Sequence, residues 1–166
     1  EIIATKEVRN EVAVSAVNTN NMDIKSMTLD ELKEELKAQG LQAFRAGQIY
    51  QWMHQKLAPS FEEMTNLSKD LRKDLTEKYS YTCLEEVRMQ ESKLDGTRKY
   101  LFELQDGNAI ESVFMKYKYG NSICVSSQAG CRMGCKFCAS TIGGRVRDLL
   151  PSELLGQIIA AELDSG

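Results

Sequence analysis

The chain has 166 residues, a formal net charge of −3 at pH 7, and 42% hydrophobic and 27% charged residues. This composition is typical of one globular domain or two small ones, and it excludes an intrinsically disordered chain. No apolar run reaches the roughly 18 residues that would span a membrane, and the first residues lack the basic start and apolar core of a secretory signal. We therefore expect a cytoplasmic protein without a membrane partner.

The first 80 residues divide into an extension and a helical part. Residues 1–25 have no convincing hydrophobic period and are predicted to be an N-terminal extension, with Met22 as a candidate native start. Residues 26–80 are predicted to form a small helical bundle. Its first helix begins at the capping-box pair Thr28 and Glu31 and ends before Gly40, a residue that suits the position after a helix.

Two further helices follow in this bundle. A helix over 43–55 is expected to bury Phe44, Ile49, Trp52 and Met53, and the single histidine, His54, is expected to have a structural or surface role. Ser60 and Glu63 repeat the capping-box pattern at a short helical turn. Ser68 is predicted to cap the last helix, which carries Leu71, Leu75 and Tyr79.

The pattern changes to strands over 81–119. Asp95–Gly96 and Asp106–Gly107 are strong hairpin signals. Between them Tyr100, Phe102 and Leu104 alternate with other residues at the period of a strand. The segment 83–117 is therefore predicted to be an antiparallel meander, so that 81–119 is a β-hairpin region.

Residues 120–166 are predicted to combine a strand, a loop and a helix. The strand covers 122–127, a glycine-flanked cysteine loop follows, and a helix runs from Pro151 to Leu163. Its expected apolar face consists of Leu154, Leu155, Ile158, Ile159 and Leu163. Strand, loop and helix are the first half of a βαβ unit, whose parallel partner strand would lie beyond Gly166. The expected fold class is α+β, ending in the first βα unit of a truncated α/β barrel.

The basic residues are unevenly distributed. No acidic residue occurs between Ser112 and Arg147, whereas this segment holds six basic ones, namely Lys116, Lys118, Arg132, Lys136, Arg145 and Arg147. A basic segment around a cysteine cluster suggests an anionic partner, for which nucleic acid is a candidate. A solvated surface segment without a partner is the alternative.

The cysteines Cys131, Cys135 and Cys138 carry the most specific signal, with the spacing C-x3-C-x2-C. Thiolates are soft ligands that suit zinc or an iron–sulfur cluster, and Gly130 and Gly134 let the loop turn tightly. A closed zinc site needs four ligands, whereas a cubane held by three cysteines leaves one iron open to a chelating molecule such as S-adenosylmethionine. A zinc site completed from elsewhere and burial in a core are the alternatives.

The run Ser122-Ile-Cys-Val-Ser-Ser-Gln-Ala-Gly-Cys-Arg-Met-Gly-Cys-Lys-Phe-Cys-Ala-Ser-Thr resembles the RlmN family of radical SAM methyltransferases. That family methylates carbon-2 of adenine in 23S rRNA and tRNA. The segments Leu-Lys-Glu-Glu-Leu-Lys and Phe-Arg-Ala-Gly-Gln-Ile-Tyr-Gln-Trp are similar to its N-terminal RNA-binding accessory domain. The resemblance covers about 26–166, so it implies that 26–80 is this accessory domain and 120–166 the start of the radical SAM core.

The resemblance also implies roles for individual residues. Cys131, Cys135 and Cys138 would ligate a [4Fe–4S] cluster, and Phe137 would contact the adenine of S-adenosylmethionine. Glu111 matches the glutamate that accepts a proton in that family. Without the resemblance, Glu111 is an ordinary exposed strand residue. Burial of Phe137 in the protein core is then as good an interpretation as packing against an adenine ring.

Other implications concern the rest of the reaction. The methyl-carrying cysteine of the family lies in its C-terminal part, and Cys124 matches a different cysteine near the active site. A monomer acting on 23S rRNA and tRNA with an electron donor such as flavodoxin is implied, and the 166 residues are expected to be inactive alone. A Cfr-type enzyme that methylates carbon-8 and a non-catalytic module that binds zinc and RNA are the alternatives.

Overall fold

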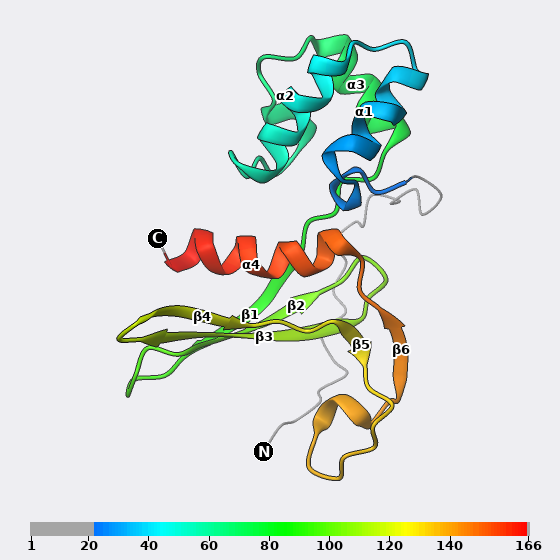
Figure 1. Cartoon of the computed structure of the whole chain (residues 1–166). Coiled ribbons are helices and arrows are strands. Elements are labelled where there is room, and N and C mark those ends of the chain that lie inside the picture. The colour runs from blue at the N-terminus through cyan, green and yellow to red at the C-terminus, as the bar shows by residue number, and fades with distance from the viewer. Residues whose placement is uncertain (1–21, 166) are drawn as a thin grey trace.

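The structure is a computed structural model that describes residues 22–165, so the predicted extension lies mostly outside the described residues. A helical part lies on one side of the molecule and a sheet covered by one helix on the other (Figure 1). The helical part contains the 3-10 turns η1 (Ile24–Ser26) and η2 (Phe61–Glu63) and the helices α1 (Leu29–Ala38), α2 (Ala43–His54) and α3 (Lys69–Lys78). The prediction of helices in this region is confirmed.

Local chemistry sets the ends of these helices. The Thr28 hydroxyl accepts from the Glu31 amide, and the Glu31 carboxylate accepts from the Thr28 amide at 2.8 Å, which is a complete capping box. Gly40 follows α1 with a φ of +78°, and the Leu41 amide returns to the Leu36 carbonyl. Ser68 caps α3 through the Leu71 amide, as predicted.

Three details of the helical part differ from the prediction. Ser60 makes no capping hydrogen bond at η2. Phe44 is 53% exposed and lies under the Arg45 guanidinium rather than in the core. Trp52 is half-buried, and its indole nitrogen donates to Asn66. The apolar period of α2 alone could not reveal these outcomes, because Ile49, Met53 and Ala46 already fill the side that meets α1 and the buried core.

The sheet is a four-stranded antiparallel meander in the order β1-β2-β3-β4. Its strands are β1 (Glu85–Glu91), β2 (Arg98–Glu103), β3 (Ala109–Tyr117) and β4 (Gly120–Cys124). Gly96 and Gly107 take positive φ at the predicted turns, which confirms both hairpins. Alternation places Tyr100, Phe102, Ile110 and Phe114 on one buried face and leaves the opposite face open.

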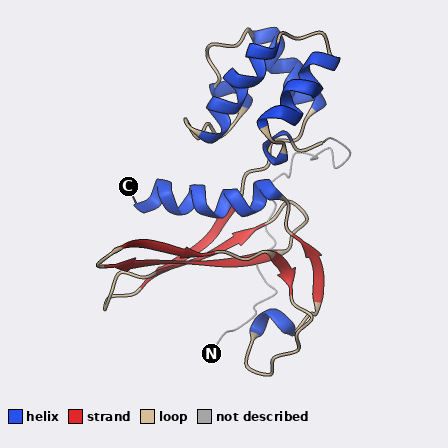
Figure 2. Ribbon diagram, in the orientation of Figure 1, coloured by secondary structure: helices blue, strands red, loops and turns tan. Residues whose placement is uncertain are grey.

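Helix α4 (Pro151–Ser165) covers the buried face of this sheet (Figure 2). The side turned to the sheet carries small or polar residues, among them Glu153, Gln157 and Ala161. A Cβ at Gly156 would lie 3.0 Å from Leu84, so glycine lets the helix approach the sheet closely. The predicted apolar face is therefore wrong in part, because three of its residues are 40–66% exposed, namely Leu155, Ile158 and Leu163.

A short second sheet pairs β5 (Gln128–Gly130) with β6 (Arg145–Asp148), also antiparallel. The strand predicted over 122–127 is the last strand of the meander and pairs with β3 rather than opening a parallel sheet. Every strand pair within 22–165 is antiparallel, so the predicted βα unit of a barrel is not confirmed. No helix in the described part of the chain is long and apolar enough to cross a membrane.

Candidate functional site

The cysteine loop is held at its neck by β5 and β6, which pair Gly130 with Arg145. Gly130 has a φ of +71°, and a Cβ on it would lie 2.0 Å from the Gly144 carbonyl oxygen. The Cys131 amide donates to that same oxygen at 3.1 Å. Only glycine fits this position, because a side chain would push the two strands apart.

Hydrogen bonds also fix the backbone inside the loop. The Cys138 amide donates to the Cys135 carbonyl at 3.1 Å, which makes a tight turn between these two cysteines. The Thr141 hydroxyl lies 3.1 Å from the Cys135 carbonyl oxygen and 2.9 Å from that of Cys138. The Met133 amide points to the Cys131 sulfur at 3.5 Å. The loop therefore has a defined path around its three cysteines.

The three thiols are free and half-buried. The alternative of cysteines in a packed core is therefore wrong, and their soft donor set suits iron or zinc. Within 22–165 no three Cys, His, Asp or Glu side chains surround a point where one metal ion could bind. A zinc ion needs its ligands about 3.8 Å apart around one centre. In an iron–sulfur cluster each thiolate binds a different iron, so a cluster does not require the three sulfurs to meet at one ion.

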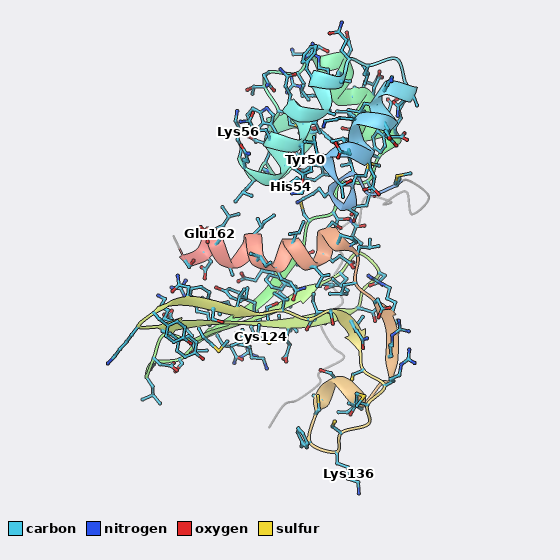
Figure 3. The ribbon with its side chains drawn as sticks, viewed as in Figure 1. Tyr50, His54, Lys56, Cys124, Lys136 and Glu162 are labelled. Atoms are coloured by element: carbon cyan, nitrogen blue, oxygen red, sulfur yellow. The ribbon has the colours of Figure 1, made fainter. Side chains whose placement is uncertain are left out.

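The outer surface of the loop is apolar and basic. Phe137 is 94% exposed, so core burial of this ring is excluded and its faces are open to a ligand. Met133 and Ile142 are also exposed on this loop, as are Arg132 and Lys136. Figure 3 shows Lys136 at the outer end of the loop, pointing away from the sheet. An anionic partner with flat aromatic rings would match this surface.

Glu111 lies on the open face of the sheet. Its neighbours Ile110 and Ser112 on β3 are buried toward α4, so Glu111 points the other way. Its carboxylate forms an ion pair with the Lys99 ammonium at 2.6 Å, and about half of the Glu111 side chain stays exposed. Cys124 pairs with Val113, two residues after Glu111, and therefore shares this face. The cysteine loop projects on the same side (Figure 3).

Comparisons with known proteins agree with this arrangement. Residues 22–80 match the model of the ribosomal RNA large subunit methyltransferase N-terminal domain. A protein of Lachnospira eligens, named probable dual-specificity RNA methyltransferase RlmN, is 62% identical over 144 residues, which are 87% of this chain and 41% of that protein. A protein of the same name from Staphylococcus aureus is 51% identical over 87% of this chain and 40% of its own length.

A solved structure matches as well. The crystal structure of a radical SAM methyltransferase from Sphaerobacter thermophilus superposes with a TM-score of 0.78 and 41% identity, covering 87% of this chain and 42% of that one. The chain belongs to the RlmN family. It spans about two fifths of the length of the relatives it matches.

In this RlmN-family chain, Gln157 joins α4 to β3 and to the segment between β4 and β5. It is fully buried, and its oxygen accepts from the Ser112 hydroxyl at 2.6 Å and from the Ser126 amide at 2.8 Å. Its nitrogen donates to the Ser126 carbonyl at 2.9 Å. The Ser126 hydroxyl in turn donates to the backbone carbonyl of Glu111 at 2.7 Å. One side chain thus fixes the backbone of Glu111 relative to the chain that enters the cysteine loop.

Arg147 performs a similar task for β6. Its guanidinium donates to both carboxylate oxygens of the buried Glu153 at 2.8 Å and to Asp106 at the β2–β3 turn. Hydrogen bonds that Arg147 donates to Glu153 and Asp106 raise the pKa of Arg147 above its usual range. Burial alone would raise the pKa of Asp106, but hydrogen bonds from Arg147 and Asn108 lower it. The strand after the loop is thereby tied to α4 and the sheet.

The sequence did not identify these two anchoring residues. Gln157 occurs among the apolar residues of a helix, which was a weak signal of a buried polar contact. Arg147 belongs to the basic segment of the sequence, yet its charge is paired with Glu153 within the chain. The charge of Arg145 is likewise paired with Asp148. Outside these ion pairs, the basic residues of the cysteine loop are Arg132 and Lys136.

The surroundings of His54 agree with the structural role expected for it. Its ring packs against Tyr50 at 4.3 Å, and burial, followed by the charge of Lys25, lowers the pKa of His54. A hollow of about 860 Å³ lies elsewhere, where the helical part meets α4 and the β2–β3 turn. Most of its charged lining is acidic, including Asp23, Glu34 and Glu35, so it does not suit a phosphate.

Proposed function

We propose that the chain is part of a radical SAM RNA methyltransferase that methylates carbon-2 of adenine in 23S rRNA and tRNA. The observation that carries this proposal is the loop with three free cysteines on a fixed backbone, in a chain 62% identical to an RlmN protein. The RlmN relatives support carbon-2 over the carbon-8 chemistry of Cfr-type enzymes.

Cys131, Cys135 and Cys138 would hold a [4Fe–4S] cluster, with one iron left for the amino and carboxylate groups of S-adenosylmethionine. When bound, the cluster and S-adenosylmethionine supply radical chemistry that can attack unactivated carbon, which acid–base catalysis cannot easily do. The chain's own part is to orient them. The β5–β6 neck and the Thr141 hydrogen bonds hold the ligating backbone in place.

Two further side chains would serve the bound molecules. Phe137, 94% exposed beside the last cysteine, would pack against the adenine ring of S-adenosylmethionine. Glu111 would accept the proton that leaves the adenine carbon during methylation, since its half-exposed carboxylate lies on the face where the loop projects. The Gln157 and Ser126 hydrogen bonds would keep the Glu111 backbone at a fixed place relative to the loop.

The helical part and the boundaries complete the proposal. Residues 26–80 would be an RNA-binding accessory domain, 81–119 a β-hairpin region and 120–166 the start of the radical SAM core. The whole enzyme would be a cytoplasmic monomer that needs an electron donor such as flavodoxin. Because the relatives are more than twice as long, we expect the 166 residues to bind the cluster without completing methylation.

Anaerobic reconstitution with iron and sulfide tests the proposal. The chain should take up about four irons and turn brown. Replacing any one of Cys131, Cys135 and Cys138 by serine should sharply reduce the iron bound. Cys83→Ser and Cys124→Ser are matched controls, because both thiols are free and exposed yet lie outside the loop. Equal iron loss in the controls, or one tightly held zinc, would overturn the proposal.

A further inference from the structure

The tip of the β3–β4 hairpin exposes two aromatic rings. The chain reverses over Lys118 and Tyr119, and Gly120 has a φ of +134° that side chains rarely allow. Tyr117 is 46% and Tyr119 84% exposed. Their rings stack with centroids 5.0 Å apart and planes within 6° of parallel. Two parallel rings held together in water leave their outer faces ready to stack on a third ring.

The same tip carries unneutralised positive charge. Lys116 and Lys118 alternate with the tyrosines and are exposed, and by strand alternation Lys116 leaves β3 on the face opposite Tyr117, so its long side chain reaches phosphates around the end of the hairpin. Lys93 is exposed on the neighbouring β1–β2 turn, at the same end of the sheet. Within 22–165 none of these three lysines forms an ion pair, unlike Arg145 and Arg147 at the other end. Charge and stacking surfaces in alternation are the features that bind a nucleic acid strand.

The tip is continuous with the open face that carries Glu111. The Tyr117 hydroxyl donates to the Met115 sulfur at 3.3 Å, so both side chains lie on one face. Val113 and Glu111 continue that face at two-residue spacing. Tyr117 follows Glu111 by six positions of strand, a distance of about 20 Å. A short RNA segment along this face can touch the tip and the proposed active site together.

We propose that Tyr117 and Tyr119 form a stacking platform for an unpaired base of the RNA substrate, while Lys116 and Lys118 contact the adjacent phosphates. This inference rests on the proposed function for the identity of the partner as RNA. The platform selects unpaired RNA, because the bases of a duplex are already stacked on each other and offer no free face. If the tip instead binds a protein, substitutions at the tip will leave RNA binding unchanged, and the test below detects that outcome.

The test measures fluorescence anisotropy of a labelled 12-nucleotide single-stranded RNA titrated with the 166-residue chain. The double variant Tyr117→Ala/Tyr119→Ala should bind this RNA about ten-fold more weakly or worse. Tyr117→Phe/Tyr119→Phe keeps both ring faces and should bind as the parent does. Leu94→Ala is the matched control, since Leu94 is 98% exposed at the same end of the sheet but has no ring.

Salt dependence tests the lysines. Each phosphate contact on a single strand contributes about −0.7 to the slope of log K against log salt, so Lys116→Ala/Lys118→Ala should flatten that slope by roughly 1.4. A 12-base-pair duplex should show no loss in the tyrosine variants. Parent-like binding by the Tyr→Ala variant, equal losses with Tyr→Phe, or no RNA binding at all would overturn the inference.

The binding assay needs no iron, so it separates the inference from the proposed function. A chain that binds iron through its loop but whose tyrosines do not affect RNA binding refutes the platform alone. A chain whose tyrosines bind RNA but whose loop takes up no iron refutes the proposed chemistry and leaves the platform standing.

Discussion

Replacing the buried Gln157 by leucine should be among the most destabilising single changes in this chain. Leucine has a similar size but neither donates nor accepts, so it leaves the Ser126 amide, the Ser126 carbonyl and the Ser112 hydroxyl without their partner. An unsatisfied buried polar group costs about 1–3 kcal/mol. The Ser126 groups are only partly buried and the hydroxyl can rotate, so we expect a total near 4 kcal/mol rather than the sum of three maximal penalties.

Urea denaturation followed by circular dichroism measures this loss. The matched control is Gln51→Leu on α2, an exposed glutamine of the same size, which should change the free energy of unfolding by less than about 0.5 kcal/mol. Adding Ser112→Ala to Gln157→Leu should recover roughly 1 kcal/mol, because one orphaned hydroxyl disappears. A loss below about 1 kcal/mol in the single variant would refute the assigned role of Gln157.

Three other perturbations test the loop and its anchors. Gly130→Ala should cost about 3 kcal/mol because its Cβ would meet the Gly144 oxygen, whereas Gly134→Ala, in open space, should cost only the roughly 1–2 kcal/mol of left-handed strain in the same urea assay. Arg147→Met should lower the free energy of unfolding by about 3–5 kcal/mol, because Glu153 stays buried without its cation. Arg145→Met is the control and should lower it by less than about 1 kcal/mol, because its partner Asp148 is exposed. Equal losses would contradict the anchoring role of Arg147. The pKa of Asp106 is lowered in the folded chain, so the stability that its carboxylate contributes is present above the unfolded pKa of about 3.9 and is lost as pH falls through the folded pKa. Thermal melts over that pH interval should therefore show a larger loss of stability in the parent than in Asp106→Asn. Parallel losses in the two proteins would contradict the ion pair with Arg147.

Features set by neighbouring residues could be predicted from the sequence. The capping box at Thr28, the glycine after α1 and the turns at Gly96 and Gly107 depend on backbone contacts within a few residues. The cysteine spacing is equally local, so the sequence alone predicts the loop. Each of these features satisfies a requirement that the adjacent chain itself creates.

Features set by contacts between residues far apart in the chain could not be predicted from the sequence. The side of α4 that meets the sheet depends on close approach at Gly156 and on Gln157, whose partner Ser112 is 45 residues away. The apolar period of the helix predicted that Leu155, Ile158 and Leu163 meet the sheet, but these three are exposed, because hydrophobicity says nothing about which neighbour is available. Pairing of β4 with β3 was missed for the same reason, since a short strand before a loop looks alike in parallel and antiparallel sheets.

The most direct test of the central claim is to count the irons that leave a reconstituted chain on mild oxidation. Three cysteines hold three of the four irons of a cubane, so the fourth has no protein ligand and should be released first. We predict that the chain falls from about four irons to about three, with the remainder lost only on denaturation. Retention of all four after oxidation, or a chain that holds one zinc and no iron, would contradict the account.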